Sequence, residues 1–334
     1  MKKINFYSAI LAFFAGAFAL SAEDTAPTAP GWHKIPVQHS HNGKVLQHTI
    51  HYYLPKHGNP AKMPVLMVMH GAGGGNGNPG KTWQTLAEYQ GFVIIAPAYP
   101  TNDYPAAAYQ HIGISKTWKS LEILPREEWT ATTVERAFDL VREKAKLEAK
   151  DYYMYGMSAG GQFIHRFLMV MPDARVRRAV FASPGTWTFP SLDGNLDNSG
   201  TLYDWPVSMR NVPDAERYLK AALQKDVVVF LGTADNGKLK PSQNPDHLFM
   251  TTPGAMAEGA GRCDRGKNAF AAAKRTAEKL QVPFRWKLIV LEGVAHNNGQ
   301  VIRGNAEILK GKITAEMCTP TGAFYQLFHD VPRQ

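Results

Sequence analysis

Cysteine is scarce in this sequence. The 334 residues include only two cysteines, Cys263 and Cys318, so the chain holds at most one disulfide. In an oxidising compartment the two would pair, and in the alternative both remain buried thiols. Neither has the neighbouring residues that are typical of a zinc site. A mean hydropathy of −0.28 and 19% charged residues argue against a protein with several membrane spans.

Dense tracts of lysine and arginine are also absent, although the formal net charge is +9. Nucleic-acid binding is therefore not expected, because such proteins gather basic residues on one face. A basic exported protein would instead meet acidic polysaccharides or cell-surface polymers. The sequence contains no internal repeat.

Residues 1–22 are predicted to be a secretory signal peptide. Lys2 and Lys3 precede an apolar stretch that is short for a membrane span and ends in small residues, as in cleaved signals. Cleavage is expected after Ala22 or after Ala19, and the alternative is an uncleaved anchor. A cut after Ala22 would remove two lysines and no acid, which lowers the net charge from +9 to +7. The mature protein is expected to be secreted or periplasmic, without stable membrane insertion.

The rest of the chain is predicted to be one α/β domain over residues 32–334, after a flexible Pro-, Ala- and Thr-rich lead-in at 23–31. Asn42-Gly43 between two alternating segments predicts a β-hairpin. Continuous apolar runs then predict buried parallel strands. These runs lie at 65–69, 92–98, 152–157, 178–183, 227–232 and 285–291.

Helical patterns alternate with these strands, at 134–145 and 265–281. We therefore expect a mostly parallel sheet with antiparallel N-terminal strands and helices on both faces. Residues 184–224 break the alternation and are rich in Gly, Pro, Asn and aromatic residues. They are expected to form an insertion over the carboxyl edge of the sheet, where such folds bind ligands.

The segment at 152–161, YYMYGMSAGG, predicts a strand, a tight turn and a helix. Ser158 lies at the centre of a G-x-S-x-G pattern, Gly156 to Gly160. Small residues on both sides let such a turn expose the serine hydroxyl at the sheet edge. The pentapeptide alone is a weak signal, so its meaning depends on the partners that a serine nucleophile needs.

A serine hydroxyl becomes nucleophilic when an imidazole accepts its proton and a carboxylate orients that imidazole. On folds with this turn, the acid follows a later strand and the histidine follows the last one. Asp235 and His296 occupy these two positions. They are predicted to complete a catalytic triad with Ser158, with Asp246 and Asp264 as alternative acids.

The loop after the predicted strand 65–69 is rich in glycine and begins at His70. Oxyanion stabilisation needs two preset backbone N–H groups. Ala159, directly after the nucleophile, is predicted to supply one. Ala72 in the glycine-rich loop is the first choice for the other, and Gly73 is the alternative. A phosphate-binding glycine loop would carry G-K-[ST], which this loop lacks.

Five motifs together resemble the α/β-hydrolase superfamily, in particular its secreted esterases of the polyhydroxybutyrate-depolymerase and feruloyl-esterase-like branch. They are HGAGGG at 70–75, GFVIIAPAYP at 91–100, GMSAGG at 156–161, GTAD at 232–235 and GVAH at 293–296. The resemblance covers about residues 44–330. It implies the α/β-hydrolase fold, catalytic Ser158, Asp235 and His296, and no cofactor or metal. Residues 184–224 match no substrate-defining pattern.

Aromatic residues and histidines lie in several segments expected near the rim of the site. Some of these side chains are candidates for substrate binding, and packing within the loops is the alternative. The candidates are His70, Trp83, Tyr104, Trp187 and Trp205. A separate histidine group comprises His39, His41, His48 and His51. Because His48 and His51 point to opposite faces of a strand, solvated strand residues are expected there rather than a metal site.

These features predict a secreted serine esterase that forms an acyl-enzyme. The expected substrates are small or polymeric esters, such as carbohydrate-linked acyl or feruloyl esters and polyester-like chains. A serine peptidase, an acyltransferase on the same fold and a non-catalytic binding module are the alternatives. The sequence makes no prediction of the oligomeric state.

Overall fold

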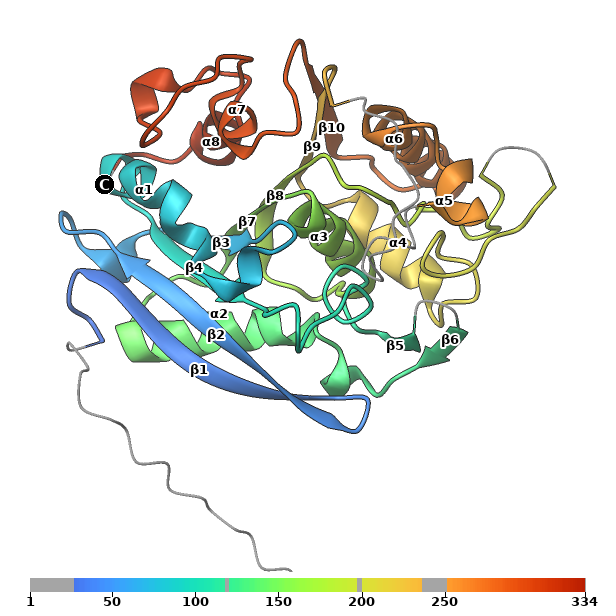
Figure 1. Cartoon of the computed structure of the whole chain (residues 1–334), viewed down its shortest axis with the longest axis horizontal. Helices are drawn as coiled ribbons and strands as arrows, with labels where there is room; N and C mark the ends of the chain where they lie inside the picture. The colour runs from blue at the N-terminus through green and yellow to red at the C-terminus, as the bar shows by residue number, and fades with distance from the viewer. Residues whose placement is uncertain (1–26, 118–119, 197–199, 236–250, 334) are drawn as a thin grey trace, which may run out of the picture.

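An eight-stranded sheet forms the centre of the protein (Figure 1). In this computed structural model, residues 27–117, 120–196, 200–235 and 251–333 are described. The strand order is β1 (Gly31–His41), β2 (Lys44–Leu54), β4 (Val93–Ala98), β3 (Val65–Met69), β7 (Tyr152–Met157), β8 (Val176–Ala182), β9 (Val227–Gly232) and β10 (Trp286–Leu291). The pairs β1–β2 and β2–β4 are antiparallel, and all other neighbours are parallel. The predicted mixed sheet is confirmed.

The antiparallel start of the sheet depends on a two-residue turn. Asn42 and Gly43 have φ of 49° and 71°, the positive values that the preferred two-residue hairpin turns require. This turn sets the register, with His41 opposite Lys44. Alternate residues of β2 from Leu46 onward then face the core.

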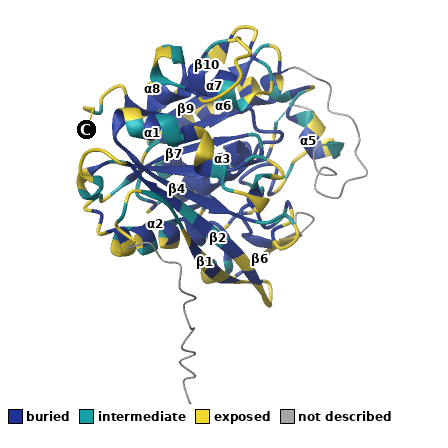
Figure 2. Ribbon diagram, turned by 60° about the vertical axis from the view of Figure 1, so that its left-hand side comes forward, coloured by how far each residue is buried: buried dark blue, intermediate teal, exposed yellow. Residues whose placement is uncertain are grey.

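Helices cover both faces of the sheet, as Figure 2 shows by the buried strands between more exposed ribbons. One face packs against α2 (Thr132–Ala145), α3 (Ala159–Val170), α4 (Ala215–Leu223) and α6 (Arg262–Lys279). The other packs against α1 (Gln84–Gln90), α7 (Asn298–Arg303) and α8 (Ala323–Phe328). Small outer elements are α5 (Pro253–Ala257), the ribbon β5 (Ser115–Thr117) and β6 (Ser120–Ile123), and the 3-10 helices η1 (Pro60–Lys62), η2 (Gly74–Asn76), η3 (Pro79–Trp83), η4 (Arg126–Glu128) and η6 (Ala315–Met317).

The two cysteines do not form the disulfide that the sequence left open. Both are free thiols, with Cys263 buried and Cys318 partly buried. Cys263 belongs to the core on one face of the sheet, whereas Cys318 packs against the core on the other. The sheet separates them, so the short Cα–Cα approach that a disulfide needs is not met.

The histidines of the N-terminal hairpin are not solvated, which corrects the expectation for three of the four. His39, His41 and His48 are 5%, 8% and 4% exposed, and only His51 is partly exposed. The chain after β4 folds over them, and the Tyr104 hydroxyl is hydrogen-bonded to His48 Nδ1 at 2.9 Å. Burial lowers the pKa of His39 to about 4 and that of His48 to about 3. No group of three potential metal-binding side chains occurs in the described ranges.

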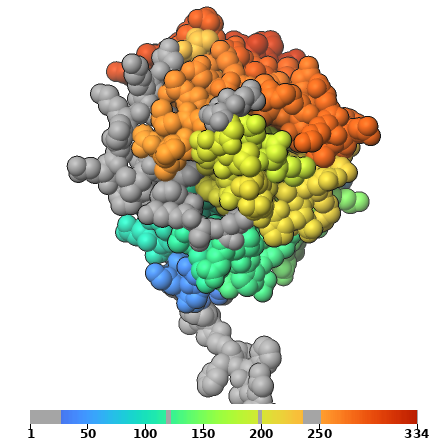
Figure 3. All heavy atoms as spheres, turned by 90° about the vertical axis from the view of Figure 1, so that its right-hand side faces the viewer, coloured from blue at the N-terminus to red at the C-terminus, as the bar shows by residue number. Residues whose placement is uncertain are grey.

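The segment expected to be an insertion, 184–224, ends in a regular helix. Residues 215–223 form α4, which packs on α3. The irregular part therefore lies between β8 and α4. In Figure 3 its yellow-green atoms lie at the surface between the orange atoms of α5 and α6 and the green atoms below.

Two predicted features of the N-terminus lie outside the described residues. These are the signal peptide at 1–22 and residues 23–26 of the lead-in. None of the helices that the structure describes is long and apolar enough to cross a membrane.

Candidate active site

Ser158 lies in a sharp turn between β7 and α3, at the carboxyl edge of the sheet. Its φ of 59° and ψ of −118° are strained for a residue with a side chain. Two glycines permit this turn by close backbone approach. A Cβ on Gly156 would lie 2.7 Å from the Gly160 carbonyl carbon, and one on Gly160 would lie 2.3 Å from Met69 O. The G-x-S-x-G pattern is thus required sterically, and it leaves Ser158 partly exposed.

Asp235 and His296 meet directly at the same edge. Asp235 follows β9 and His296 follows β10, and neighbouring parallel strands bring their carboxyl ends together. The Nδ1–H of His296 donates to Asp235 Oδ2 at 2.7 Å. The Asp235 side chain is 3% exposed and that of His296 is 34% exposed. A buried carboxylate holding a more exposed imidazole is the arrangement that fixes the histidine tautomer in a triad.

Backbone contacts hold the acid loop and the histidine loop against each other. The N–H of Ala234 donates to Val294 O at 3.1 Å, and Thr233 Oγ1 accepts from Gly293 N–H at 2.9 Å. Both bonds join the two residues that precede Asp235 to residues two and three positions before His296. The geometry of the pair is therefore built into the main chain.

The histidine loop is also tied to the strand that carries Ser158. The hydroxyl of Tyr155, three residues before the serine, donates to Asn298 Oδ1 at 2.6 Å. No described group hydrogen-bonds the Ser158 hydroxyl, so the structure joins Asp235 to His296 but does not join His296 to Ser158. Such bonds are often long in free enzymes and tighten when substrate binds. The alternative acid Asp264 is exposed at the start of α6, and Asp246 lies outside the described residues.

The glycine-rich loop after β3 passes beside the nucleophile. A Cβ on Gly71 would lie 3.9 Å from Ser158 Cβ, which brings the neighbouring Ala72 close to the serine. Ala159 is the first residue of α3, where backbone N–H groups have no partner within the helix. Both positions suit oxyanion donors, and that role stays a prediction.

His70 shapes this loop from the inside. It is 4% exposed, its Nδ1–H donates to Gly71 O at 2.8 Å, and its Nε2 accepts from Tyr99 N–H at 3.2 Å. Its ring stacks on Tyr109 at 4.1 Å. Burial lowers its pKa to about 4, so the ring is neutral. Both ring nitrogens are occupied by the backbone, which leaves neither for the predicted substrate contact.

The four aromatic candidates are also buried. Trp83, Tyr104, Trp187 and Trp205 are between 0% and 4% exposed. Trp83 packs edge-on against Tyr155 at 4.7 Å, and Trp187 packs on His165 at 4.9 Å. All four rings pack in the interior in this conformation, as in the loop-packing alternative. A direct role in substrate binding stays a prediction.

Arg262 is a functional candidate for which the sequence predicted no role. Its Nη1 donates to Asp235 Oδ1 at 3.2 Å, so Asp235 is held between a guanidinium and the imidazole of His296. The two residues are 27 positions apart and lie on different elements. No spacing rule links them, and only the packing of α6 beside β9 brings them together.

A buried ionic group fixes the start of α6. Glu258 and Arg265 have fully buried side chains with 4.0 Å between Oε2 and Nε. Glu258 also accepts the Trp187 N–H at 2.8 Å, and Arg265 donates to Gly185 O at 2.7 Å. Burial raises the pKa of Glu258, although Arg265 opposes that rise. This group ties the irregular segment after β8 to the helix turn that carries Arg262.

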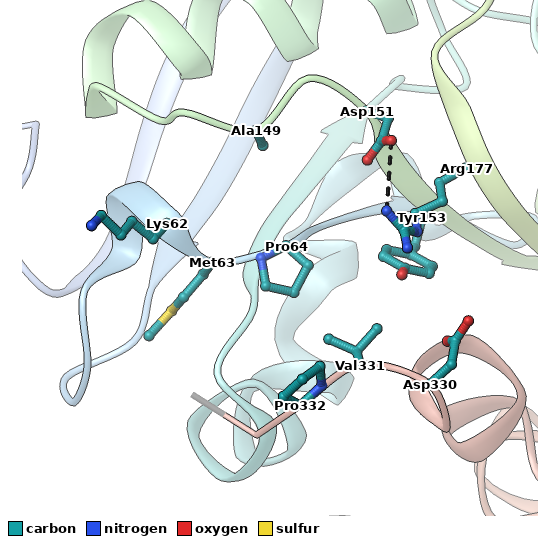
Figure 4. A pocket seen from close by; sticks show the side chains of 10 residues that line it. All are labelled: Lys62, Met63, Pro64, Ala149, Asp151, Tyr153, Arg177, Asp330, Val331 and Pro332. Atoms are coloured by element: carbon teal, nitrogen blue, oxygen red, sulfur yellow. Dashed lines mark ion pairs between the residues drawn. The ribbon is translucent and has the colours of Figure 1, made fainter.

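Two hollows are present on opposite edges of the sheet. One is a cavity of about 600 Å³ that has His296 in its wall. The other, of about 270 Å³, lies near the amino ends of β3 and β7 (Figure 4). Its wall includes the ion pair between Asp151 and Arg177, 3.9 Å apart. Because the predicted catalytic groups all lie at the carboxyl edge, the larger of these two hollows is the one that adjoins them.

Comparisons with known proteins agree with this architecture. No family model and no curated protein matches the sequence. Among solved structures, poly(aspartic acid) hydrolase-1 from Sphingomonas sp. KT-1 is 32% identical, with a TM-score of 0.67 over 81% of this chain and 95% of that one. A poly(3-hydroxybutyrate) depolymerase from Bordetella parapertussis is 24% identical, with a TM-score of 0.68 over 81% of this chain and 86% of that one.

The chain matches 95% of the Sphingomonas hydrolase at 32% identity, and a match of this extent and identity shows that the two proteins belong to one family. The second relative has the same fold. The turn at Ser158, the mostly parallel sheet and the paired loops after β9 and β10 are all parts of that fold. The chain therefore belongs to the α/β-hydrolase superfamily and resembles its polyhydroxybutyrate-depolymerase-like branch.

Proposed function

We propose that the protein is an exported serine hydrolase that cleaves carboxylic esters through Ser158, His296 and Asp235. The observation that carries this proposal is the 2.7 Å hydrogen bond between His296 and the buried carboxylate of Asp235. It lies at the sheet edge where the turn at Ser158 presents a strained, partly exposed serine.

The proposed reaction is acyl transfer to Ser158 followed by hydrolysis. His296 Nε2 accepts the serine proton as the hydroxyl attacks the ester carbonyl, and it then returns that proton to the departing alcohol. Asp235 keeps Nδ1 protonated and stabilises the imidazolium. The N–H groups of Ala159 and Ala72 stabilise the oxyanion. Water, activated by the same histidine, then releases the acid and regenerates the serine.

Polymeric substrates fit the comparisons, because both reported relatives carry names of enzymes that act on polymers. A second candidate function is cleavage of an amide bond, since the 32% identical relative is named a poly(aspartic acid) hydrolase. The same triad cleaves esters and amides. Amide cleavage would place the protein nearer to the peptidase alternative.

An ester and amide panel tests the proposal. The panel contains p-nitrophenyl acetate and butyrate, acetylated xylan, methyl ferulate, a polyester film and poly(aspartic acid). We expect ester turnover that falls by about 10⁶-fold in Ser158→Ala and is unchanged in Ser40→Ala, which removes an exposed hydroxyl from the N-terminal hairpin. Equal turnover in wild type and Ser158→Ala would refute the proposal. Cleavage of poly(aspartic acid) without any ester cleavage would select the amide alternative.

Export is tested separately by sequencing the N-terminus of the protein recovered outside the cytoplasm. A mature chain that begins at Glu23 or Leu20 is the expected result. An intact Met1 on protein that stays with the membrane would show that residues 1–22 act as an anchor.

A further inference from the structure

The cavity beside His296 is lined by basic groups with no acidic counterpart. Its wall is formed by η3 and the start of α1, by the histidine loop with α7, and by residues 308–313. Lys81, Arg303 and Lys312 contribute three positive charges. None of the described residues in the wall is acidic.

Arg303 is the unusual member of this group. The residue is 3% exposed, and no carboxylate in the described ranges lies within ion-pair distance of it. Its Nη2 donates to Glu307 O at 2.5 Å, and its buried Nε has no partner among the described residues. Glu307 accepts this bond through its main-chain carbonyl, so its carboxylate does not pair with Arg303.

The guanidinium lies close to the catalytic histidine loop. A Cβ on Gly299 would lie 3.1 Å from Arg303 Nη1, and Gly299 is three residues beyond His296. A charge held out of water without a counterion is costly, and an anion at hydrogen-bond distance offsets that cost. The two exposed lysines, Lys81 and Lys312, line the same cavity and add a field of the same sign.

We propose that this cavity binds a carboxylate carried by the leaving part of the substrate. This inference rests on the proposed function, in which His296 protonates the leaving group, so that a group in the cavity beside His296 belongs to that side of the scissile bond. The substrate class is then an acyl compound whose alcohol or amine portion bears an acid, as in a polyanionic chain cut between acidic units.

The cavity of about 600 Å³ has the size of a small-molecule site. It can hold one acidic unit of such a chain, with the carboxylate near Arg303 and the lysines at the entrance. Neutral side chains of the wall, among them Thr82, Asn297 and Leu309, surround this charged end. Recognition would therefore depend on charge more than on a fitted apolar surface.

A matched pair of esters tests the inference. The probes are 4-acetoxybenzoate and 4-acetoxybenzamide, which share the acetyl group and differ in the charge on the leaving group. We expect wild-type protein to prefer the carboxylate in kcat/KM, and the double variant Lys81→Gln/Lys312→Gln to lose about fivefold of that preference. Both lysines are exposed, so this variant folds even if Arg303→Gln does not.

The control is Lys44→Gln/Lys150→Gln, which removes the same charge from the hairpin and from the turn before β7. Its preference should equal that of the wild type. Raising the salt concentration from about 0.05 M to about 0.5 M should weaken the wild-type preference by screening. The same rise in salt should have a smaller effect on the preference of Lys81→Gln/Lys312→Gln, in which two of the charges are already removed.

The two hypotheses fail in different ways. Absence of Ser158-dependent cleavage of either probe overturns the proposed function itself. If the enzyme cleaves both esters through Ser158 but shows no preference for 4-acetoxybenzoate over 4-acetoxybenzamide, the proposed anion site alone is overturned. A preference that persists in the lysine variant and in high salt also overturns it.

Discussion

Arg262 is expected to hold Asp235 in the orientation that the catalytic histidine needs. Its guanidinium and the His296 imidazole bind the two oxygens of one carboxylate, at 3.2 Å and 2.7 Å. Because the guanidinium holds Oδ1, the other carboxylate oxygen, Oδ2, stays directed at His296 Nδ1. Loss of the guanidinium would remove this charge-assisted bond and let the carboxylate rotate away from the imidazole.

The size of the effect follows from this geometry. A hydrogen bond between charged partners contributes about 1.5–3 kcal/mol. The Arg262 side chain is 21% exposed and that of Asp235 is 3% exposed, so solvent screening at the arginine favours the lower end of this range. A loss of about 1.5–2 kcal/mol of transition-state stabilisation corresponds to a fall of about 10- to 30-fold in kcat/KM.

The assay is kcat/KM with a neutral ester. In Arg262→Gln we expect kcat/KM to fall about 10- to 30-fold, and Arg262→Lys should restore most of the wild-type value because it keeps a positive donor at this position. Arg275→Gln, at an exposed position further along α6, controls for net charge. An unchanged kcat/KM in Arg262→Gln, or an equal fall in Arg275→Gln, would refute this reasoning.

Two further predictions concern stability. Burial holds the pKa of His39 at about 4, below its ordinary 6.5. The stability that depends on the neutral ring is therefore fully present above pH 6.5 and is lost as the pH falls toward 4, because the unfolded chain takes up the proton first. His39→Gln should reduce the difference in unfolding free energy between about pH 7 and pH 4.5 by about 2–3 kcal/mol, as measured by urea denaturation. The control is His57→Gln, at an exposed position. If the difference in His39→Gln equals that of the wild type, the assignment to His39 is wrong. Glu258→Ala removes the carboxylate that forms the ion pair with the fully buried Arg265 and should cost about 3–5 kcal/mol. A fall in Tm no larger than that of Glu258→Gln would contradict a charge effect.

Features that depend on near neighbours in the chain were predictable. Asn42-Gly43 alone determines a hairpin turn, because both residues accept positive φ. The apolar runs become fully buried strands such as β7 and β9. The order of the turn at Ser158, the acid and the histidine follows from strand order, because each group directly follows a strand.

Charge placement across elements was not predictable from the sequence. Arg262 is 27 residues from Asp235. Arg303 becomes a candidate for anion binding only because the wall of the cavity that it lines contains no acidic residue among those described. The hairpin histidines were expected in solvent, since alternation along a strand does not show that the chain after β4 covers them. Likewise, two cysteines in one chain do not reveal that a sheet lies between them.

The sequence by itself thus determined the fold class and the chain positions of the predicted nucleophile, acid and base, because strand periodicity, turn chemistry and the G-x-S-x-G constraint are local. Tertiary structure alone decided the hydrogen bond between Asp235 and His296, the guanidinium on the far side of that carboxylate and the basic cavity beside the histidine. These features depend on distances between side chains from separate elements, and such distances exist only after the sheet and its helices have packed.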